Sequence, residues 1–355
     1  MSIHRRDFAR LGVAAIAAFG LGVPARAQDA SPFADVLAHI DPQLRPSALR
    51  MLTMSAQSQP LGDATVAKRR TESASYAAPL LPDIRVDERQ IAGARGHPPV
   101  TVFVINAGGA GARPGILHTH GGGFILGQAR YELRFLQELA RDLDCIVVSV
   151  EYRLAPEARF TGSLEDNYAG LRWMHASARE LGLDPKRVAL LGESAGGGHA
   201  ALLAIAARDR GEVPVAFQAL IYPMLDDRTG SSVRTPAHIG AVLWDAASNR
   251  YGWRSLLGVE PGGGAVPAAG VPARVADLAG LPPTFIAVGG VDLFVSEDIT
   301  YGRRLNEAGV PVELHVFPGG YHAFDRVASE TEIAERFTRI KMDALRRAFG
   351  QALPA

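Results

Sequence analysis

The sequence predicts an α/β fold in which a mostly parallel sheet carries helices on both faces. Short apolar runs alternate with segments of helical periodicity from about residue 115 to the C-terminus. Such alternation is typical of parallel sheets, whose strands are joined by helices. Glycines gather directly after two of the apolar runs, at 121–123 and within 192–198. These positions indicate tight turns where strands end.

Eight segments are predicted to be strands because they are short, apolar and rich in β-branched residues. The first two, 84–91 and 100–105, are separated by the Gly93–Pro99 turn, so we expect them to form an antiparallel edge of the sheet. The other predicted strands are 115–119, 145–150, 188–191, 216–222, 284–288 and 312–317.

Helical spacing of apolar side chains predicts helices between these strands. They cover 131–143, 164–181, 194–208, 296–308 and about 330–349. Each lies between or after predicted strands, as a crossover in a parallel sheet requires.

Two parts of the chain interrupt the alternation. Residues from about 28 to 80 contain two or three predicted helices, and residues from about 223 to 281 separate consecutive strands by far more than a crossover needs. The second part includes a predicted helix at 241–257 and a Gly/Pro-rich loop at 261–272. We expect the two parts to form a cap over the carboxyl ends of the strands. A disordered linker between two domains is the alternative, which the aromatic residues of this part disfavour.

The composition excludes several classes of protein. Hydrophobic residues make up 47% and charged residues 21% of the 355-residue chain, which excludes a disordered or coiled-coil protein. The 37 basic residues balance 37 acidic ones, so we expect no nucleic acid partner. The single cysteine, Cys145, excludes an intramolecular disulfide and a Cys-rich metal site.

The first 27 residues have the layout of a secretory signal peptide. Arg5 and Arg6 precede an apolar run over 11–23, and small residues follow at 25–27. The arginine pair with Phe8 resembles a twin-arginine signal. We therefore expect export to the periplasm or beyond, cleavage after Ala27, and no stable membrane insertion of the 28–355 domain. An uncleaved anchor is the alternative, but the run is short for a span of about 20 residues. N-terminal sequencing of the exported protein tests this.

The segment Gly192–Gly196 reads G-E-S-A-G and matches the G-x-S-x-G pattern of a nucleophile elbow. It lies between the apolar strand 188–191 and a helix of small residues, where a strand must reverse sharply. The pattern predicts that Ser194 is a nucleophile. The alternatives are an ordinary turn with a capping serine and a nucleotide-binding loop. The second lacks the lysine and the glycine spacing that phosphate loops use.

The segment His120–Phe124 reads H-G-G-G-F and follows the strand 115–119. Glycines leave backbone N–H groups accessible, and such groups can stabilise negative charge that develops on a carbonyl oxygen. The amides of Gly122 and Gly123, with that of Ala195, are therefore predicted to form an oxyanion hole. A flexible glycine loop is the alternative.

Three motifs together resemble the hormone-sensitive lipase family of α/β-hydrolase esterases. They are H-G-G-G-F at 120–124, Y-R-L-A-P-E at 152–157 and G-E-S-A-G-G at 192–197, and the resemblance covers roughly 80–325. It implies the α/β-hydrolase fold with an eight-stranded sheet and a two-part helical cap. The family elbow usually reads G-D-S-A-G, so Glu193 replaces an aspartate, and its role stays open. G-E-S-A-G-G also occurs in type B carboxylesterases, which are much longer and contain several cysteines.

In this fold the catalytic acid and base follow the nucleophile along the chain. Asp292 follows the strand 284–288 and resembles the family's acid, although Leu293 comes directly after it. His322 follows the strand 312–317, and Ala323-Phe324 completes a signature close to the family's H-G-F. The competing residues are Glu297 and Asp298, which fall in a predicted helix, and His315, which falls inside a strand.

The remaining histidines are predicted to be structural. His118 and His120 could form a metal pair, but no third ligand lies nearby in the sequence, so we expect no metal. His199 is expected to pack on the helix after the elbow. Charged residues that resemble loop-holding positions of the family are also expected to be structural: Glu151, Arg153, Glu157 and Asp166.

These residues together predict hydrolysis of small to medium acyl esters through Ser194, His322 and Asp292, with an acyl-enzyme and no cofactor. A lactonase or amidase with the same triad is one alternative. A ligand-binding protein without activity is another, which the presence of His322 disfavours. Aromatic side chains that could line the substrate pocket, with core packing as the alternative, are Phe33, Phe124, Trp244 and Trp253. The natural substrate, the stereoselectivity and a homodimeric state stay open.

Overall fold

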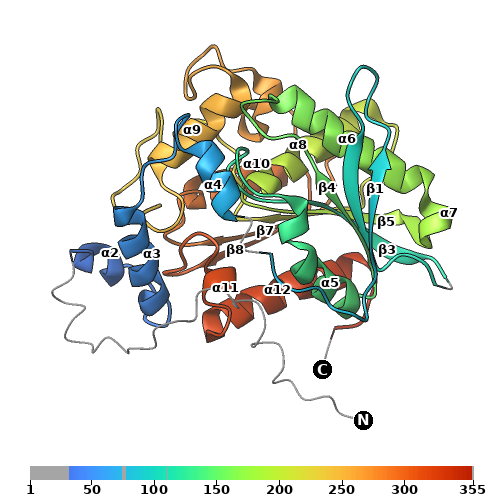
Figure 1. Ribbon diagram of the computed structural model, residues 1–355, viewed down its shortest axis with the longest axis horizontal. Coiled ribbons are helices and arrows are strands. Elements are labelled where there is room, and N and C mark those ends of the chain that lie inside the picture. Colours follow the sequence, from blue (N-terminus) through green and yellow to red (C-terminus); the bar gives the residue numbers. More distant parts are fainter. Residues whose placement is uncertain (1–31, 74–76, 110, 354–355) are drawn as a thin grey trace, which may run out of the picture.

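The structure is a computed structural model that describes residues 32–73, 77–109 and 111–353 (Figure 1). The predicted signal peptide, residues 1–27, lies outside the described residues and stays a prediction. An eight-stranded sheet with the strand order β1-β2-β4-β3-β5-β6-β7-β8 forms the centre of the molecule. The strands are β1 (Val86–Ile91), β2 (Val100–Ile105), β3 (Arg113–Thr119), β4 (Ile146–Glu151), β5 (Leu183–Glu193), β6 (Phe217–Ile221), β7 (Thr284–Gly289) and β8 (Val312–Phe317).

The sheet is mostly parallel, as the sequence predicts. β1 pairs with β2 and β2 pairs with β4 in antiparallel register, whereas the remaining neighbours are parallel. The predicted antiparallel edge of the first two strands is therefore confirmed. Their tight connection brings Gly93 against the carbonyl oxygen of Pro98, which a Cβ at Gly93 would approach to 2.0 Å.

Helices cover both faces of this sheet, because alternate residues of each strand are apolar on opposite sides. In β2, Phe103 and Ile105 belong to one buried core and Val102 and Val104 to the other. The first core is covered by α5 (Leu133–Asp142) and α12 (Glu332–Ala348). The second is covered by α6 (Phe160–Ala176), α8 (Ala195–Arg210) and α10 (Val295–Glu307). Figure 1 shows these two layers above and below the sheet.

The N-terminal part of the described chain consists of α2 (Ala34–Ala38), α3 (Arg45–Gln57) and α4 (Val66–Ser73). The Asp41 amide donates to the Gly319 carbonyl at 3.1 Å, and the Tyr321 hydroxyl donates to Ser47 Oγ at 2.8 Å. These contacts attach α2 and α3 to the loop after β8. Further on, Arg70 of α4 donates to the carbonyl oxygens of Ile125 and Ala155 at 2.7 Å each.

The long segment between β6 and β7 contains α9 (Ala246–Leu257) and short 3-10 turns. The Tyr251 hydroxyl of α9 lies 2.9 Å from Asp63 Oδ1, just before α4. The figure accordingly shows α4 and α9 on the same side of the molecule (Figure 1). The division of 28–355 into a hydrolase domain and two cap parts stays a prediction, and residues 28–31 lie outside the described part. Within the described residues, no helix is both long and apolar enough to cross a membrane.

Candidate active site

The turn predicted as a nucleophile elbow requires glycine on both sides of Ser194. Ser194 lies between β5 and α8 with φ 58° and ψ −123°, a backbone conformation that L-residues rarely adopt. A Cβ at Gly192 would meet the Gly196 carbonyl oxygen at 2.3 Å, and one at Gly196 would meet that of Thr119 at 2.0 Å. The Ser194 amide donates to the Ile221 carbonyl of β6 at 2.9 Å, which fixes the strained residue.

The structure brings together the three residues that the sequence predicts as nucleophile, base and acid. His322 Nε2 lies 3.0 Å from Ser194 Oγ, and His322 Nδ1 lies 2.8 Å from Asp292 Oδ2. The second oxygen of Asp292 accepts a hydrogen bond from the Phe294 amide at 3.0 Å. Asp292 is fully buried, whereas Ser194 and His322 are each 7% exposed. The serine and the imidazole therefore keep a small exposed surface, whereas the carboxylate has none.

The competing residues do not reach the serine. His315 lies in β8 and pairs with Glu313 at 2.9 Å. Glu297 and Asp298 lie on α10, as predicted. Burial raises the pKa of both carboxyl groups well above the usual range.

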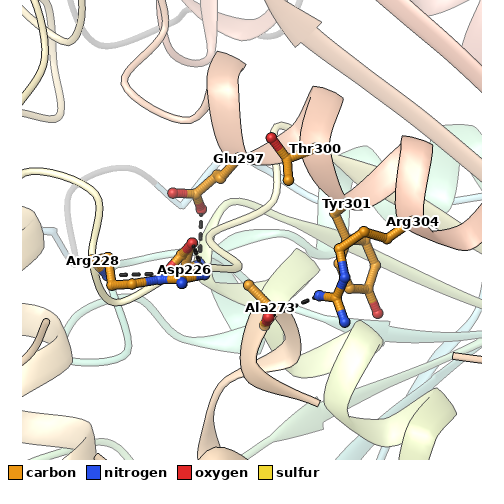
Figure 2. A pocket seen from close by; sticks show the side chains of 7 residues that line it. All are labelled: Asp226, Arg228, Ala273, Glu297, Thr300, Tyr301 and Arg304. Carbon is orange, nitrogen blue, oxygen red and sulfur yellow. Dashed lines mark hydrogen bonds and ion pairs between the residues drawn. The ribbon is translucent and has the colours of Figure 1, made fainter. Parts of the chain in front are cut away.

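Glu297 instead holds the chain that follows β6. Its Oε1 accepts hydrogen bonds from the amides of Leu225 at 2.6 Å and Asp226 at 3.1 Å. It lines a cavity of about 250 Å³ whose side chains are shown in Figure 2. Other lining residues are bonded within the protein: Arg228 to Asp226, and Arg304 to the Ala273 carbonyl (Figure 2). Ser194 does not line this cavity. The amide of Met224, the residue before Leu225, donates to the Ser194 carbonyl at 2.9 Å, so the chain that Glu297 holds is bonded directly to the serine.

The glycine loop after β3 lies against the elbow. A Cβ at Gly121 would lie 3.6 Å from the Ser194 Cβ. Gly122 and Gly123 have φ values of 123° and 60°, which favour glycine. Among the hydrogen bonds of the described residues, the amides of Gly122, Gly123 and Ala195 donate to no protein acceptor. Three backbone donors, two in the glycine loop and one next to Ser194, are therefore left without an acceptor among the described residues.

Glu193 forms a buried contact that the sequence does not reveal. Its Oε2 lies 2.9 Å from His118 Nε2, and His118 Nδ1 lies 2.8 Å from Ser149 Oγ. Burial alone would raise the pKa of Glu193, but the adjacent His118 lowers it below its usual value. Both ring nitrogens of His118 are occupied, so it does not pair with His120. No cluster of three potential metal ligands occurs in the part of the chain that the structure describes.

A group of buried rings supports the glycine loop from beneath. His120 stacks on Tyr152 at 4.1 Å, and His199 makes edge contacts with Tyr152 at 4.5 Å and Phe124 at 4.9 Å. The Tyr152 hydroxyl also donates to the His120 carbonyl at 2.6 Å. The predicted packing role of His199 agrees with this position. The group is completed by Trp253, 4.9 Å from Phe124.

This arrangement corrects two of the predicted pocket residues. Phe124 is 1% exposed and Trp253 is fully buried, so neither presents a surface to a substrate in this structure. Both rings are part of the core under the glycine loop. Phe33, just before α2, is half-buried and packs against the core between the sheet and α12. Trp244 is half-buried and lies against Gly123, where a Cβ would meet its indole Cη2 at 2.0 Å.

Two of these rings predict a loss of stability in acid. Burial lowers the pKa of His120 to about 4 and that of His199 to about 3. In the unfolded chain both imidazoles take up a proton near pH 6.5, whereas in the folded chain they stay neutral to lower pH. The free energy of unfolding is therefore expected to fall below pH 6.5, by about 1.4 kcal/mol per pH unit for each histidine.

The substitution His199→Leu is expected to remove one of these two contributions. Urea unfolding at pH 8, 6 and 5 should show a shallower acid slope for the variant than for the wild type. At pH 8 both imidazoles are neutral in either state, so this measurement is the control. Equal acid slopes in the two proteins would contradict the assignment.

Comparison with known proteins identifies the family of the chain. Residues 116–326, more than half of the chain, match the α/β hydrolase fold family. Esterase LipI of Mycobacterium tuberculosis is 34% identical over 325 residues, which are 89% of this chain and 98% of that protein. Carboxylesterase NlhH of the same organism is 34% identical over 80% of this chain and 89% of its own.

Solved structures give the same result. A bacterial heroin esterase is 37% identical, with a TM-score of 0.77, over 88% of this chain and 99% of its own. Esterase LipW from Mycobacterium marinum is 34% identical, with a TM-score of 0.71, over 88% of this chain and 97% of its own. The chain therefore belongs to the α/β hydrolase fold family. Within that family it is similar to named esterases over most of its length, and it is an enzyme of the esterase type.

Proposed function

We propose that this protein hydrolyses carboxylic esters with small to medium acyl groups, using Ser194 as nucleophile, His322 as base and Asp292 as the orienting acid. The observation that carries the proposal is the continuous chain of contacts from Ser194 Oγ through the His322 ring to Asp292 Oδ2. At its serine end, this chain of contacts lies beside backbone amides that have no protein acceptor.

In this mechanism the Ser194 oxygen attacks the ester carbonyl carbon while His322 Nε2 takes the hydroxyl proton. The carbonyl oxygen becomes negative and accepts hydrogen bonds from the amides of Gly122, Gly123 and Ala195. Removal of one such donor typically costs about 3–4 kcal/mol of barrier. The buried Asp292 holds the ring and stabilises its positive charge.

The tetrahedral intermediate then collapses, and His322 gives the proton to the departing alcohol oxygen. The acyl group is left on Ser194 as an ester. A water molecule then attacks the acyl carbonyl carbon while His322 takes its proton. Collapse of the second intermediate releases the carboxylic acid, and the proton returns to the Ser194 oxygen. Apart from the ester and this water molecule, the groups that act in these steps are residues of the chain.

Lactones and amides are open to the same machinery, because the triad does not recognise the leaving group. An amine is a poorer leaving group than an alcohol and depends more on protonation by His322 as it departs. We therefore place esters first. Matched p-nitrophenyl esters and p-nitroanilides with the same acyl group separate an esterase from an amidase. A ligand-binding role without turnover is disfavoured, since all three triad side chains are in contact.

The experiment that tests the proposal combines turnover with labelling of the serine. The purified protein is expected to hydrolyse p-nitrophenyl acetate and butyrate, and to lose activity in diethyl p-nitrophenyl phosphate. Peptide mass spectrometry should then find one diethylphosphoryl group on Ser194. A folded protein, judged by circular dichroism, that turns over neither ester and takes up no label would overturn the proposal.

A further inference from the structure

Tyr222 is the first residue after β6, and β6 lies between the strands that lead to Ser194 and Asp292. In the sheet order β5-β6-β7-β8, Ser194 comes directly after β5, Asp292 follows β7 and His322 follows β8. The Tyr222 amide donates to the Ala287 carbonyl of β7 at 2.7 Å. Four neighbouring parallel strands therefore each bring one side chain to the same edge of the sheet, and the tyrosine is the one that the proposed mechanism does not use.

The backbone of Tyr222 has a conformation that bulky residues rarely adopt. Its φ is 36°, in the left-handed region that favours glycine. Such strain persists only where the surroundings enforce it, and strained residues cluster at functional sites. Tyr222 is also only 2% exposed. A role of this residue is therefore expected to act on its protein neighbours and not on a substrate.

The imidazole of His322 lies against two aromatic rings. The Tyr222 ring is centred 4.9 Å from it, with the ring planes at 66°, and the Phe294 ring is centred 5.3 Å away, at 84°. Edge contacts of this kind are a preferred arrangement of aromatic rings. The single hydrogen bond between His322 Nδ1 and Asp292 Oδ2 allows some tilt of the imidazole plane, which the two rings restrict.

The Tyr222 ring is itself held at its far end. Its hydroxyl donates to Asp325 Oδ1 at 3.1 Å, and Asp325 Oδ2 lies 3.6 Å from Lys341 Nζ. Burial raises the pKa of Tyr222 well above its usual value, so the hydroxyl keeps its proton and remains a donor. The ring also stacks on Phe337 of α12, with the ring centres 6.0 Å apart. These contacts give the tyrosine one defined position beside the imidazole.

We propose that Tyr222 is a positioning residue for the proposed base: its ring keeps the His322 imidazole at the tilt that points Nε2 toward Ser194 Oγ. The hydrogen bond to Asp325 holds the tyrosine in place for this task. Positioning matters here because proton transfer from the serine requires a short and well-aligned contact. Tyr222 contributes no reacting atom. The inference rests on the proposed function, because it takes His322 as the base that activates Ser194.

The test compares the wild type with Tyr222→Leu and Tyr222→Phe on p-nitrophenyl acetate and butyrate. Leucine removes the ring, so kcat is expected to fall at least about 30-fold, whereas KM should change less than about threefold because Tyr222 is buried. Phenylalanine keeps the ring and loses only the hydroxyl, so kcat is expected to fall about three- to tenfold.

A second measurement reports on the imidazole directly. A histidine N–H that is hydrogen-bonded to a carboxylate gives a proton NMR signal far downfield. The signal of the His322 Nδ1–H, bonded to Asp292, is expected to weaken in Tyr222→Leu, because the imidazole is no longer held at one tilt. It should persist in Tyr222→Phe. A purely structural role of the tyrosine would lower Tm without changing this signal.

The matched control is Tyr301→Leu, which makes the same change at another buried tyrosine. Tyr301 of α10 is 1% exposed and belongs to the core on the other face of the sheet. The ring contacts of the described residues include none between Tyr301 and His322. This variant should lose stability, as Tyr222→Leu does, but keep the wild-type kcat and the downfield signal.

A Tyr222→Leu variant that is folded by circular dichroism and keeps kcat within about threefold of the wild type would overturn the inference while the esterase function stands. A change confined to KM would do the same. If the leucine variant does not fold, Tyr222→Phe decides, and an unchanged kcat with an unchanged signal overturns the inference. A wild-type protein that hydrolyses neither ester would instead contradict the proposed function.

Discussion

Replacing Ser194 by alanine is expected to lower kcat/KM for p-nitrophenyl acetate on the order of 10⁴- to 10⁶-fold. The substitution removes the only hydroxyl that lies 3.0 Å from His322 Nε2 in the described structure, so no acyl-enzyme can form. The amides of Gly122, Gly123 and Ala195 remain, and they can still polarise the carbonyl of a bound ester. Activity is therefore expected to fall to a small residual rate above the uncatalysed reaction.

The measurement is initial rates with enough variant protein to resolve this residual rate. Ser296→Ala is the control, because Ser296 is an exposed serine at the start of α10, four residues beyond Asp292. It should retain the wild-type rate. A loss of less than tenfold in Ser194→Ala would show that another group is the nucleophile.

Replacing Lys341 by methionine is expected to destabilise the protein by about 3–5 kcal/mol. Lys341 of α12 and Asp325 of α11 (Phe324–Val327) are 2% and 5% exposed, and their charged atoms lie 3.6 Å apart. The lysine nitrogen also lies 5.2 Å from the centre of the Phe135 ring. Methionine fills a similar volume but leaves the Asp325 carboxylate without its nearest charged partner.

This ion pair is linked through Tyr222 to His322, the proposed base. The Tyr222 hydroxyl donates to Asp325 Oδ1 at 3.1 Å, and the Tyr222 ring makes an edge contact with His322 at 4.9 Å. Thermal and urea unfolding measure the loss, which corresponds to a fall in Tm on the order of 10 °C. The double variant Lys341→Met with Asp325→Asn removes both charges and keeps an acceptor for Tyr222. It should recover most of the stability, and a double variant as unstable as the single one would contradict this explanation.

The strands could be predicted from sequence where apolar residues run on or alternate between two turns. β2 and β8 have the predicted bounds: β2 is apolar apart from Thr101, and in β8 the polar Glu313 and His315 alternate with apolar residues. β5 extends over Leu183–Glu193 rather than 188–191. Its first part contains Asp184-Pro185-Lys186-Arg187, which is polar, and only pairing of Leu183 with Arg113 of β3 makes it part of the sheet. α9 likewise begins at Ala246 and not at 241, since Asp245 caps it.

The three residues that we propose as nucleophile, base and acid could be found because strand ends and glycine turns are visible in the sequence. Ser194, Asp292 and His322 each follow a recognisable strand, and parallel strands bring such residues to one edge of a sheet. The surroundings of the site could not be predicted in the same way. The spacing of the aromatic residues does not distinguish the buried Trp253 from the half-buried Trp244. In α12, nothing in the sequence indicates that Lys341 pairs with a buried aspartate. Those differences depend on how distant segments pack.

The glycines on either side of Ser194 restrict how this turn can vary among descendants of the chain. A Cβ at Gly192 or Gly196 would collide with backbone, whereas a Cβ at Gly263 or Gly264 would meet nothing within 4 Å. A descendant that keeps the turn is therefore expected to keep Gly192 and Gly196, while Gly263 and Gly264 can be exchanged for other residues.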